Sequence, residues 1–156
     1  MNSPAPALTI RPLQATDHDQ WRPLWDGYNA FYGRSGPTAL AEAVNVTLWH
    51  RLLDPTVPLF ANVAERNGQL VGLTHYLYHL RPAQIAPICY LSDLFTAPES
   101  RGLGAGRALI ESVYQAAKQH GCNRVYWSTH NTNATARKLY DQVAENQGFI
   151  LYNKVL

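Results

Sequence analysis

A glycine-rich segment, "RGLGAGR" from Arg101 to Arg107, joins an apolar run to an amphipathic one, and it restricts the fold of this chain more than any other stretch. The preceding run, "ICYLSDLFT", has the length and composition of a β-strand. In the run that follows, apolar residues recur at the spacing of one helical face: Ala105, Leu109, Val113 and Ala116. The segment therefore predicts a strand, a turn of bare backbone and a helix N-terminus in succession, which suits an anionic ligand such as a phosphate.

The spacing of the glycines separates this segment from two well-known phosphate-binding motifs. A Walker loop needs Gly-Lys-Ser/Thr, but Gly106 is followed by Arg107 and Ala108. A dinucleotide fingerprint needs GxGxxG and an acid about 20 residues later, but the chain has GxGxG, and Arg124 occupies that later position. The remaining pattern is Arg-x-x-Gly-x-Gly, whose successive amides can form an anion-binding nest between two arginines. A glycine-rich turn that only opens a surface helix is the alternative.

The other elements predict a single α/β domain with one mixed, mostly antiparallel sheet and helices on both faces. Strands are expected at 8–13, 88–96, 124–129 and 148–156, and a hairpin at 59–80 turns at Asn67-Gly68. A first helix is expected after the first strand, because Trp21, Trp25, Tyr28 and Tyr32 share one helical face. Further helices are expected at 39–53, 105–121 and 135–145, and Asn133 is the expected cap of the last one. Residues 1–7, rich in Pro and Ala, are expected to form a flexible tail before a domain at 8–156.

Composition limits the compartment and the partners. The chain has 156 residues, enough for one domain, and its net charge of +2 is too small to predict a nucleic-acid partner. No signal peptide or membrane-spanning run is visible, so we expect no membrane partner. Cys89 and Cys122 match neither a metal-binding spacing nor a disulfide framework, which favours reduced thiols in a cytoplasmic protein without a metal.

Three blocks of the sequence together resemble the GNAT superfamily of acetyl-CoA-dependent N-acetyltransferases. The blocks are "YLSDLFTAPESRGLGAGRAL", "VYWSTHNTNATARKLYDQVAENQGF", and the N-terminal strand with its aromatic helix. The first two blocks are most similar to the polyamine and histone acetyltransferase branch. The resemblance implies acetyl-CoA as cosubstrate, bound in a cleft between splayed fourth and fifth strands.

The resemblance also implies a set of cofactor-binding residues. Backbone groups of Leu94, Phe95 and Thr96 would bind the pantetheine arm, and the segment that would hold the pyrophosphate comprises Arg101, Gly102, Leu103, Gly104, Ala105, Gly106 and Arg107. Asn133 and Ala136, at the start of the last helix, would complete the cofactor site.

Tyr140 matches the tyrosine that protonates the departing thiolate of CoA in this superfamily. A phenol has a pKa of about 10, so it stays protonated at neutral pH and can donate once charge develops on sulfur. The alternative is a tyrosine that only packs in the core.

The general base is open. In the resembling branch a glutamate removes the proton of the amine, and its position here is Ser92, whose hydroxyl can order a water but cannot be the final base. Asp93 is expected to face away from the acceptor, because adjacent strand residues point to opposite faces. The remaining alternatives are His75, His79 and His130.

The acceptor side is expected in the segment between the first two helices, where Tyr28, Tyr32 and Arg34 are substrate-binding candidates. Only Asp26 and Glu42 lie at its margins, so a smaller amine or an amino acid fits better than a polyamine. We expect direct transfer without a covalent enzyme intermediate. A non-catalytic acyl-CoA-binding protein and an enzyme acting on protein lysine or N-terminal amines are the alternatives.

A second copy of the chain is the expected protein partner. The terminal strand at 149–156 is apolar and would leave an open sheet edge, which predicts a homodimer paired partly through these residues.

Overall fold

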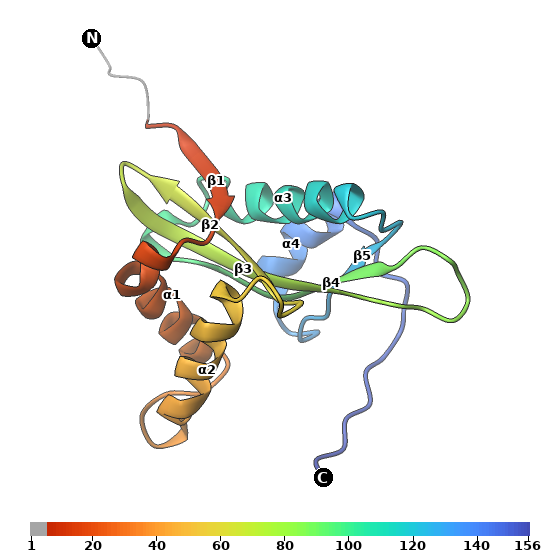
Figure 1. The fold of residues 1–156 in the computed structure, drawn as a ribbon, viewed down its shortest axis with the longest axis horizontal. Helices are drawn as coiled ribbons and strands as arrows, with labels where there is room; N and C mark the ends of the chain where they lie inside the picture. Colours follow the sequence, from red (N-terminus) through yellow and green to blue (C-terminus); the bar gives the residue numbers. More distant parts are fainter. Residues whose placement is uncertain (1–5) are drawn as a thin grey trace.

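The computed structural model describes residues 6–156 and shows one five-stranded sheet with helices on both faces (Figure 1). The strands are β1 (Leu8–Pro12), β2 (Phe60–Arg66), β3 (Gln69–His79), β4 (Ile88–Thr96) and β5 (Val125–Tyr126), and they follow one another in this order across the sheet. The helices are α1 (His18–Phe31), α2 (Glu42–Leu53), α3 (Ala105–Gln119) and α4 (Ala134–Val143). All neighbouring strands are antiparallel except β4 and β5, which confirms the predicted mixed sheet. Of the tail expected at 1–7, residues 1–5 lie outside the described residues.

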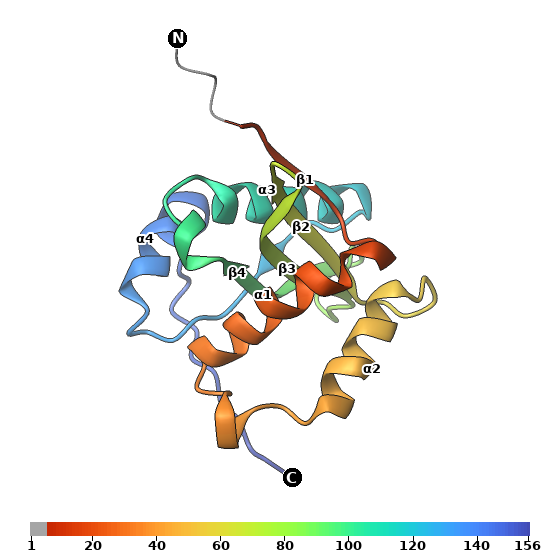
Figure 2. The same cartoon turned by 90° about the vertical axis from the view of Figure 1, so that its left-hand side faces the viewer.

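The two sheet faces carry different helices, as Figure 2 shows end-on. Helix α1 packs its aromatic stripe against β3 and β4, where Trp21, Trp25 and Tyr28 are buried together with Phe95. A Cβ atom on Gly27 would lie 2.8 Å from the Phe95 ring, so any larger residue there would force this ring to shift. Helix α3 covers the opposite face, and α4 packs beside it.

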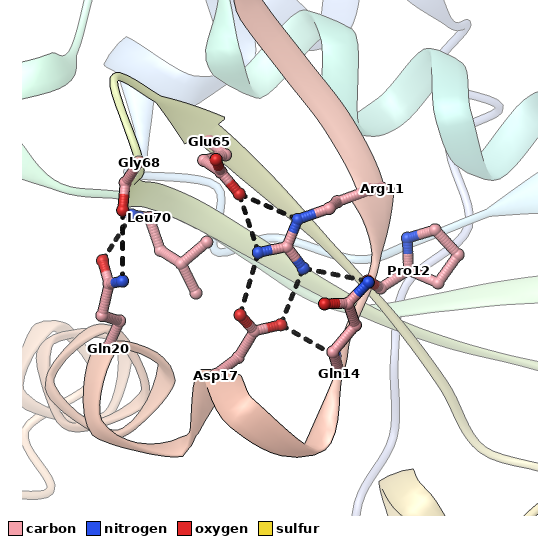
Figure 3. A network of polar contacts seen from close by, with 8 residues as sticks. All are labelled: Arg11, Pro12, Gln14, Asp17, Gln20, Glu65, Gly68 and Leu70. Carbon is pink, nitrogen blue, oxygen red and sulfur yellow. Dashed lines mark hydrogen bonds and ion pairs between the residues drawn. The ribbon is translucent and has the colours of Figure 1, made fainter.

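An arginine-centred network ties β1 to β2 and to the start of α1 (Figure 3). The Arg11 guanidinium donates to both carboxylate oxygens of Asp17, at 2.7 and 2.9 Å, and its Nε lies 2.8 Å from Glu65 Oε2. Asp17 is only 5% exposed, and the hydrogen bond from Arg11 holds the pKa of this carboxyl below its ordinary value although burial opposes the shift. Gln20, nearby on α1, accepts from the Leu70 amide at 2.8 Å and so fixes the helix to the β2–β3 hairpin.

The hairpin between β2 and β3 has the turn that its sequence predicts. Asn67 and Gly68 have φ of 53° and 72°, the left-handed values that a tight Asn-Gly turn requires. This turn sets the pairs Arg66↔Gln69 and Glu65↔Leu70, and after a register shift between Glu65 and Ala64 the pairing continues from Ala64↔Gly72 to Phe60↔Tyr76.

Two expectations about the C-terminal part are wrong. The strand expected at 124–129 is reduced to Val125–Tyr126, and the strand expected at 148–156 does not form. From Ala144 onward the chain has no regular structure and extends beyond the folded body (Figure 1). A strand needs a partner for its backbone amides and carbonyls, and no described strand pairs with this segment.

Candidate active site

Strands β4 and β5 diverge soon after they meet. β5 pairs with β4 only at Cys89 and Tyr90, whereas β4 continues to Thr96. On its other edge β4 stays paired with β3 up to Thr96↔Gly72. The backbone of Leu94, Phe95 and Thr96 therefore has one strand partner and one open edge, which gives an extended ligand a place to pair.

The glycine-rich segment lies where β4 leads into α3. Gly102 and Gly104 have φ of 75° and 87°, values that L residues rarely adopt, and Gly104 is the N-cap of α3. The first-turn amides that follow have no acceptor within the helix. Arg101 folds back to β4, with its Nε donating to Thr96 O at 3.2 Å, while the exposed Leu103 points away from the core.

Gly106 has a different structural role from Gly102 and Gly104. A Cβ atom there would lie 3.4 Å from Leu139 Cδ2 of α4. Arg107, the next residue, donates to Gln142 Oε1 of the same helix. This end of the segment therefore fixes α3 against α4, and the positive-φ glycines before it form the open turn.

Tyr140 lies on α4, half-buried, with its ring against Trp127 at a centroid distance of 5.4 Å. Burial, with a smaller contribution from the neighbouring Tyr32, raises the pKa of Tyr140 to about 12, so its hydroxyl stays protonated at neutral pH. Asn133 is the N-cap of α4, but its side chain donates to Thr129 Oγ1 at 3.1 Å instead of capping the helix. Ala136 follows in the first turn.

A β-bulge changes which way the middle of β4 faces. The register is His75↔Asp93 and then Tyr76↔Leu91, so Ser92 is an extra residue without a partner on β3. Leu91 packs towards α3, whereas Ser92 and Asp93 both line a pocket on the α2 side. The premise for expecting Asp93 to face away from the acceptor, that Ser92 and Asp93 point to opposite faces of the strand, is therefore wrong, because strict alternation fails at the bulge.

His75, fully buried, is held at both ring nitrogens. Trp21 Nε1 lies 3.2 Å from His75 Nε2, and His75 Nδ1 lies 3.0 Å from Asp93 Oδ2. An indole can only donate, so Nε2 accepts, and the ring proton lies on Nδ1 and points to the carboxylate. His75 therefore has no free nitrogen for an acceptor amine, and its interaction with Asp93 joins the core to the pocket.

The environment of Asp93 favours its charged form. Burial tends to raise the pKa of this carboxyl, but the hydrogen bond from His75 and the hydroxyls of Tyr28 and Ser92 bring the pKa below its ordinary value. The Asp93 side chain is 17% exposed, so the carboxylate can still be reached from the pocket.

The other two candidate histidines lie on the surface. His79 Nε2 lies 2.7 Å from the Tyr126 hydroxyl and its Nδ1 lies 2.8 Å from Leu80 O, so both nitrogens have partners. His130 bonds the side chain of Thr132 at 2.6 Å in the loop before α4.

The end of α1 brings the predicted acceptor residues together. Arg34 donates from Nε to Asn29 Oδ1 at 2.8 Å, and its guanidinium lies 5.8 and 5.6 Å from the ring centroids of Tyr28 and Tyr32. Burial raises the pKa of the Tyr32 hydroxyl, and the nearby charge of Asp93 raises it further. Since Tyr32 likewise affects Tyr140, α1, β4 and α4 converge at this point.

Comparison with known proteins agrees with this geometry. The sequence model of the Acetyltransferase (GNAT) family matches residues 21–144. The chain belongs to this family. A D-amino-acid N-acetyltransferase from Saccharomyces cerevisiae is 33% identical over 149 residues, covering 94% of this chain and 90% of the relative. An uncharacterized N-acetyltransferase from Bacillus subtilis is 31% identical over 147 residues, covering 93% and 95%.

Solved structures show the same fold. Among them is the aminoglycoside acetyltransferase AAC(6')-Iy in complex with the bisubstrate analogue CoA-S-monomethyl-acetylneamine. Its TM-score with this chain is 0.80 at 18% identity, over 96% of this chain and 99% of the other. Together with the sequence relatives, the family membership shows that the protein is an N-acetyltransferase.

The thiols of this acetyltransferase are poorly suited to nucleophilic catalysis. Cys89 and Cys122 are both free, and Cys89 is buried in the core on the α3 side. Burial, with the nearby Cys122 thiol, raises the pKa of Cys89 to about 12, which keeps it in the unreactive thiol form. Within residues 6–156, no group of His, Cys, Asp and Glu has the arrangement of a metal site, and no helix is both long and apolar enough to cross a bilayer.

Two residues that line the pocket beside Asp93 were not predicted from the sequence. Arg51 and Thr47 of α2 line the pocket beside Asp93, but α2 has no motif that marks them. For Asp93 a signal existed, since it is an acid within an otherwise apolar strand, and strict alternation concealed its direction.

Proposed function

We propose that this N-acetyltransferase transfers the acetyl group of acetyl-CoA directly to the primary amine of a small molecule. The observation that carries the proposal is Tyr140, half-buried on α4, whose side chain packs against the cluster that contains Cys89 and Leu91 of β4 and whose raised pKa keeps its hydroxyl protonated. A protein that only binds acyl-CoA would have no need of an acid at this position.

Acetyl-CoA suits the residues that surround this edge. In the proposed complex, backbone groups of Leu94, Phe95 and Thr96 pair with the pantetheine arm, and Asn133 and Ala136 bind it from α4. The pyrophosphate is bound by the amides of the segment 101–107, with charge from Arg101 and Arg107. The positive-φ glycines and the N-terminus of α3 support this assignment, because together they expose amides to an anion.

The chain's residues divide the proton transfers between them. The amine nitrogen forms a bond to the acetyl carbon as the carbon–sulfur bond breaks, and Tyr140 supplies a proton to the leaving sulfur. Ser92 orders the water that takes the proton of the ammonium group, and His75 and His79 are excluded as bases because each has a partner at both ring nitrogens. His130, in the loop before α4, is the alternative base. The likeness of "YLSDLF" to the polyamine and histone acetyltransferase branch remains a hypothesis about ancestry.

A panel of acceptors tests the function. Release of CoA thiol from acetyl-CoA is measured over amino acids, polyamines, aminoglycosides and basic peptides. Turnover of a small amine supports the proposal, and the amino-acid activity named for the yeast relative makes amino acids the first class to try. Turnover of peptides alone would favour an enzyme acting on proteins, and acetyl-CoA binding without any turnover would favour the non-catalytic protein.

We also propose a homodimer. Six exposed apolar residues lie between positions 149 and 156: Phe149, Ile150, Leu151, Tyr152, Val155 and Leu156. Among residues 6–156, β5 pairs with β4 alone, so a segment from a second copy could extend the sheet and cover these side chains. The two free thiols support a reducing compartment such as the cytoplasm as its location.

A further inference from the structure

A pocket of about 510 Å³ lies between α2 and the bulge of β4. One wall comes from Thr47, Leu48 and Arg51 of α2, and another from Ser92 and Asp93. Trp25 also lines the pocket, and its ring centroid lies 5.4 Å from that of Tyr28. The Tyr28 hydroxyl hydrogen-bonds Asp93 and helps to lower the pKa of its carboxyl.

The charges lining this pocket are one anion and one cation. Asp93 is its carboxylate and Arg51 its guanidinium. Among residues 6–156, Arg51 forms no ion pair, so its charge is available to a ligand.

Glu42 and Asp26, which adjoin the pocket residues Ala43 and Trp25 in the sequence, are already paired. Arg22 donates to Glu42 at 2.6 and 2.8 Å and to Asp26 at 2.9 Å. A polyamine carries several cations and needs several free carboxylates, which this pocket does not offer. A ligand with one ammonium and one carboxylate matches the charges that are free.

Asp93 is fixed before a ligand arrives. His75 donates to one carboxylate oxygen from Nδ1, and Trp21 holds His75 in this tautomer through Nε2. These partners lie 18 and 54 residues apart in the sequence and are buried, so the carboxylate is preorganised. His75 and Trp21 are thus positioning residues that act through Asp93.

We propose, resting on the function proposed above, that this pocket is the acceptor subsite for an α-amino acid, whose ammonium group lies against Asp93 and whose carboxylate is bound by Arg51. Trp25, Leu48 and Leu59 contact the amino-acid side chain.

Matched acceptors and variants test the two charge contacts. Leucine, leucinamide and 3-methylbutylamine are compared, with both enantiomers of the first two, by initial rates of CoA-thiol release. Arg51→Met should lower kcat/KM for leucine about 10- to 100-fold, mostly through KM, and change the other two acceptors less than about twofold. Asp93→Asn should lower kcat/KM of all three by about 10- to 100-fold.

Arg124→Met is the matched control, because it removes the guanidinium of an exposed residue that does not line this pocket, and it should leave the preference for leucine over leucinamide unchanged. Arg34→Met tests whether the other guanidinium near the site binds the carboxylate instead. A loss of that preference in Arg34→Met but not in Arg51→Met would overturn the assignment. An equal effect of Arg51→Met on all three acceptors would do so as well.

Two measurements do not depend on turnover. Calorimetry with leucine on the CoA-loaded protein measures binding at the subsite without turnover. If leucine binds, Arg51→Met abolishes this binding and no form of the protein shows turnover, the subsite is correct and the proposed function is wrong. Absence of leucine binding would reject the subsite, even if other amines were turned over. The ¹⁵N spectrum of His75 should show a protonated Nδ1 and an unprotonated Nε2, and the opposite tautomer would contradict the positioning role.

Discussion

The Trp21 indole donates to His75 Nε2 at 3.2 Å, while His75 Nδ1 lies 3.0 Å from the Asp93 carboxylate. A histidine held in this way cannot accept a proton from an amine without losing the bond to Trp21. Instead, it orients the Asp93 carboxylate of the candidate acceptor pocket. This relationship bears directly on the pH dependence of the enzyme.

We expect kcat/KM to rise with pH towards the pKa of the acceptor amine, because a water beside Ser92 takes the proton and both ring nitrogens of His75 and His79 already have partners. Ser92→Ala should reduce the rate modestly, and Ser92→Glu should improve turnover of cationic amines by restoring a carboxylate. The measurement is a pH–rate profile on an identified acceptor. A limb near pH 6.5 that disappears in a His75→Ala, His79→Ala or His130→Ala variant would show that a histidine is the base after all.

Tyr140→Phe should lower kcat about 10- to 1,000-fold and change acetyl-CoA affinity little, because the hydroxyl matters chiefly as sulfur becomes charged. Steady-state kinetics and calorimetry separate the two quantities. Tyr114→Phe is the control. It removes a hydroxyl of α3 that donates to Val143 O of α4 at 2.8 Å and has no part in the proposed chemistry. Unchanged turnover in Tyr140→Phe would assign Tyr140 to the core alone.

Gly104→Asp should abolish acetyl-CoA binding, because it places a negative side chain among the amides proposed to bind the pyrophosphate. Gly104 has φ 87°, so the substitution also strains the backbone. Gly121→Asp is the matched control, since Gly121 has φ 85° and lies at the opposite end of α3. Thermal-shift titration should show normal binding in the control, and equal loss in both variants would make strain the cause.

Asp17→Asn should destabilise the fold by about 2 kcal/mol at pH 7, because it breaks a charge-assisted pair with Arg11 that is mostly buried. The folded-state pKa of Asp17 is lowered, so this stabilisation is complete above the unfolded-state pKa of about 4 and is lost as the pH falls through the folded value. Denaturant unfolding at pH 7 and below pH 4 should therefore show a difference between wild type and variant that shrinks in acid. Glu65→Gln, at the more exposed partner of Arg11, should cost less at pH 7.

Light scattering at micromolar concentration should give the mass of a dimer. Replacing Ile150 and Leu151 together by Lys should shift it to monomer, because charged side chains on both faces of the segment oppose pairing. Leu80→Lys changes another exposed apolar residue, outside this segment, and should leave the dimer intact. A wild-type monomer under these conditions would contradict the proposal.

The sequence by itself determined the elements whose signals are local. The Asn67-Gly68 turn, the helical aromatic stripe from Trp21 to Tyr32 and the glycines before α3 depend on backbone preferences and periodicity within a few residues. The order of such elements predicted the mixed sheet, whereas the acetyltransferase family and the splay of β4 and β5 were implied by the resemblance of three sequence blocks to the GNAT superfamily.

Tertiary structure decided the direction and state of the polar groups. Asp93 turns towards the pocket because β3 and β4 shift register at Ser92, and a one-residue shift cannot be read from either strand alone. The tautomer of His75 depends on Trp21, 54 residues away, and the place of Arg51 depends on how α2 packs over the sheet. The apolar segment at 149–156 has the composition of a strand, but pairing needs a neighbour with free backbone groups, and composition does not say which chain supplies one.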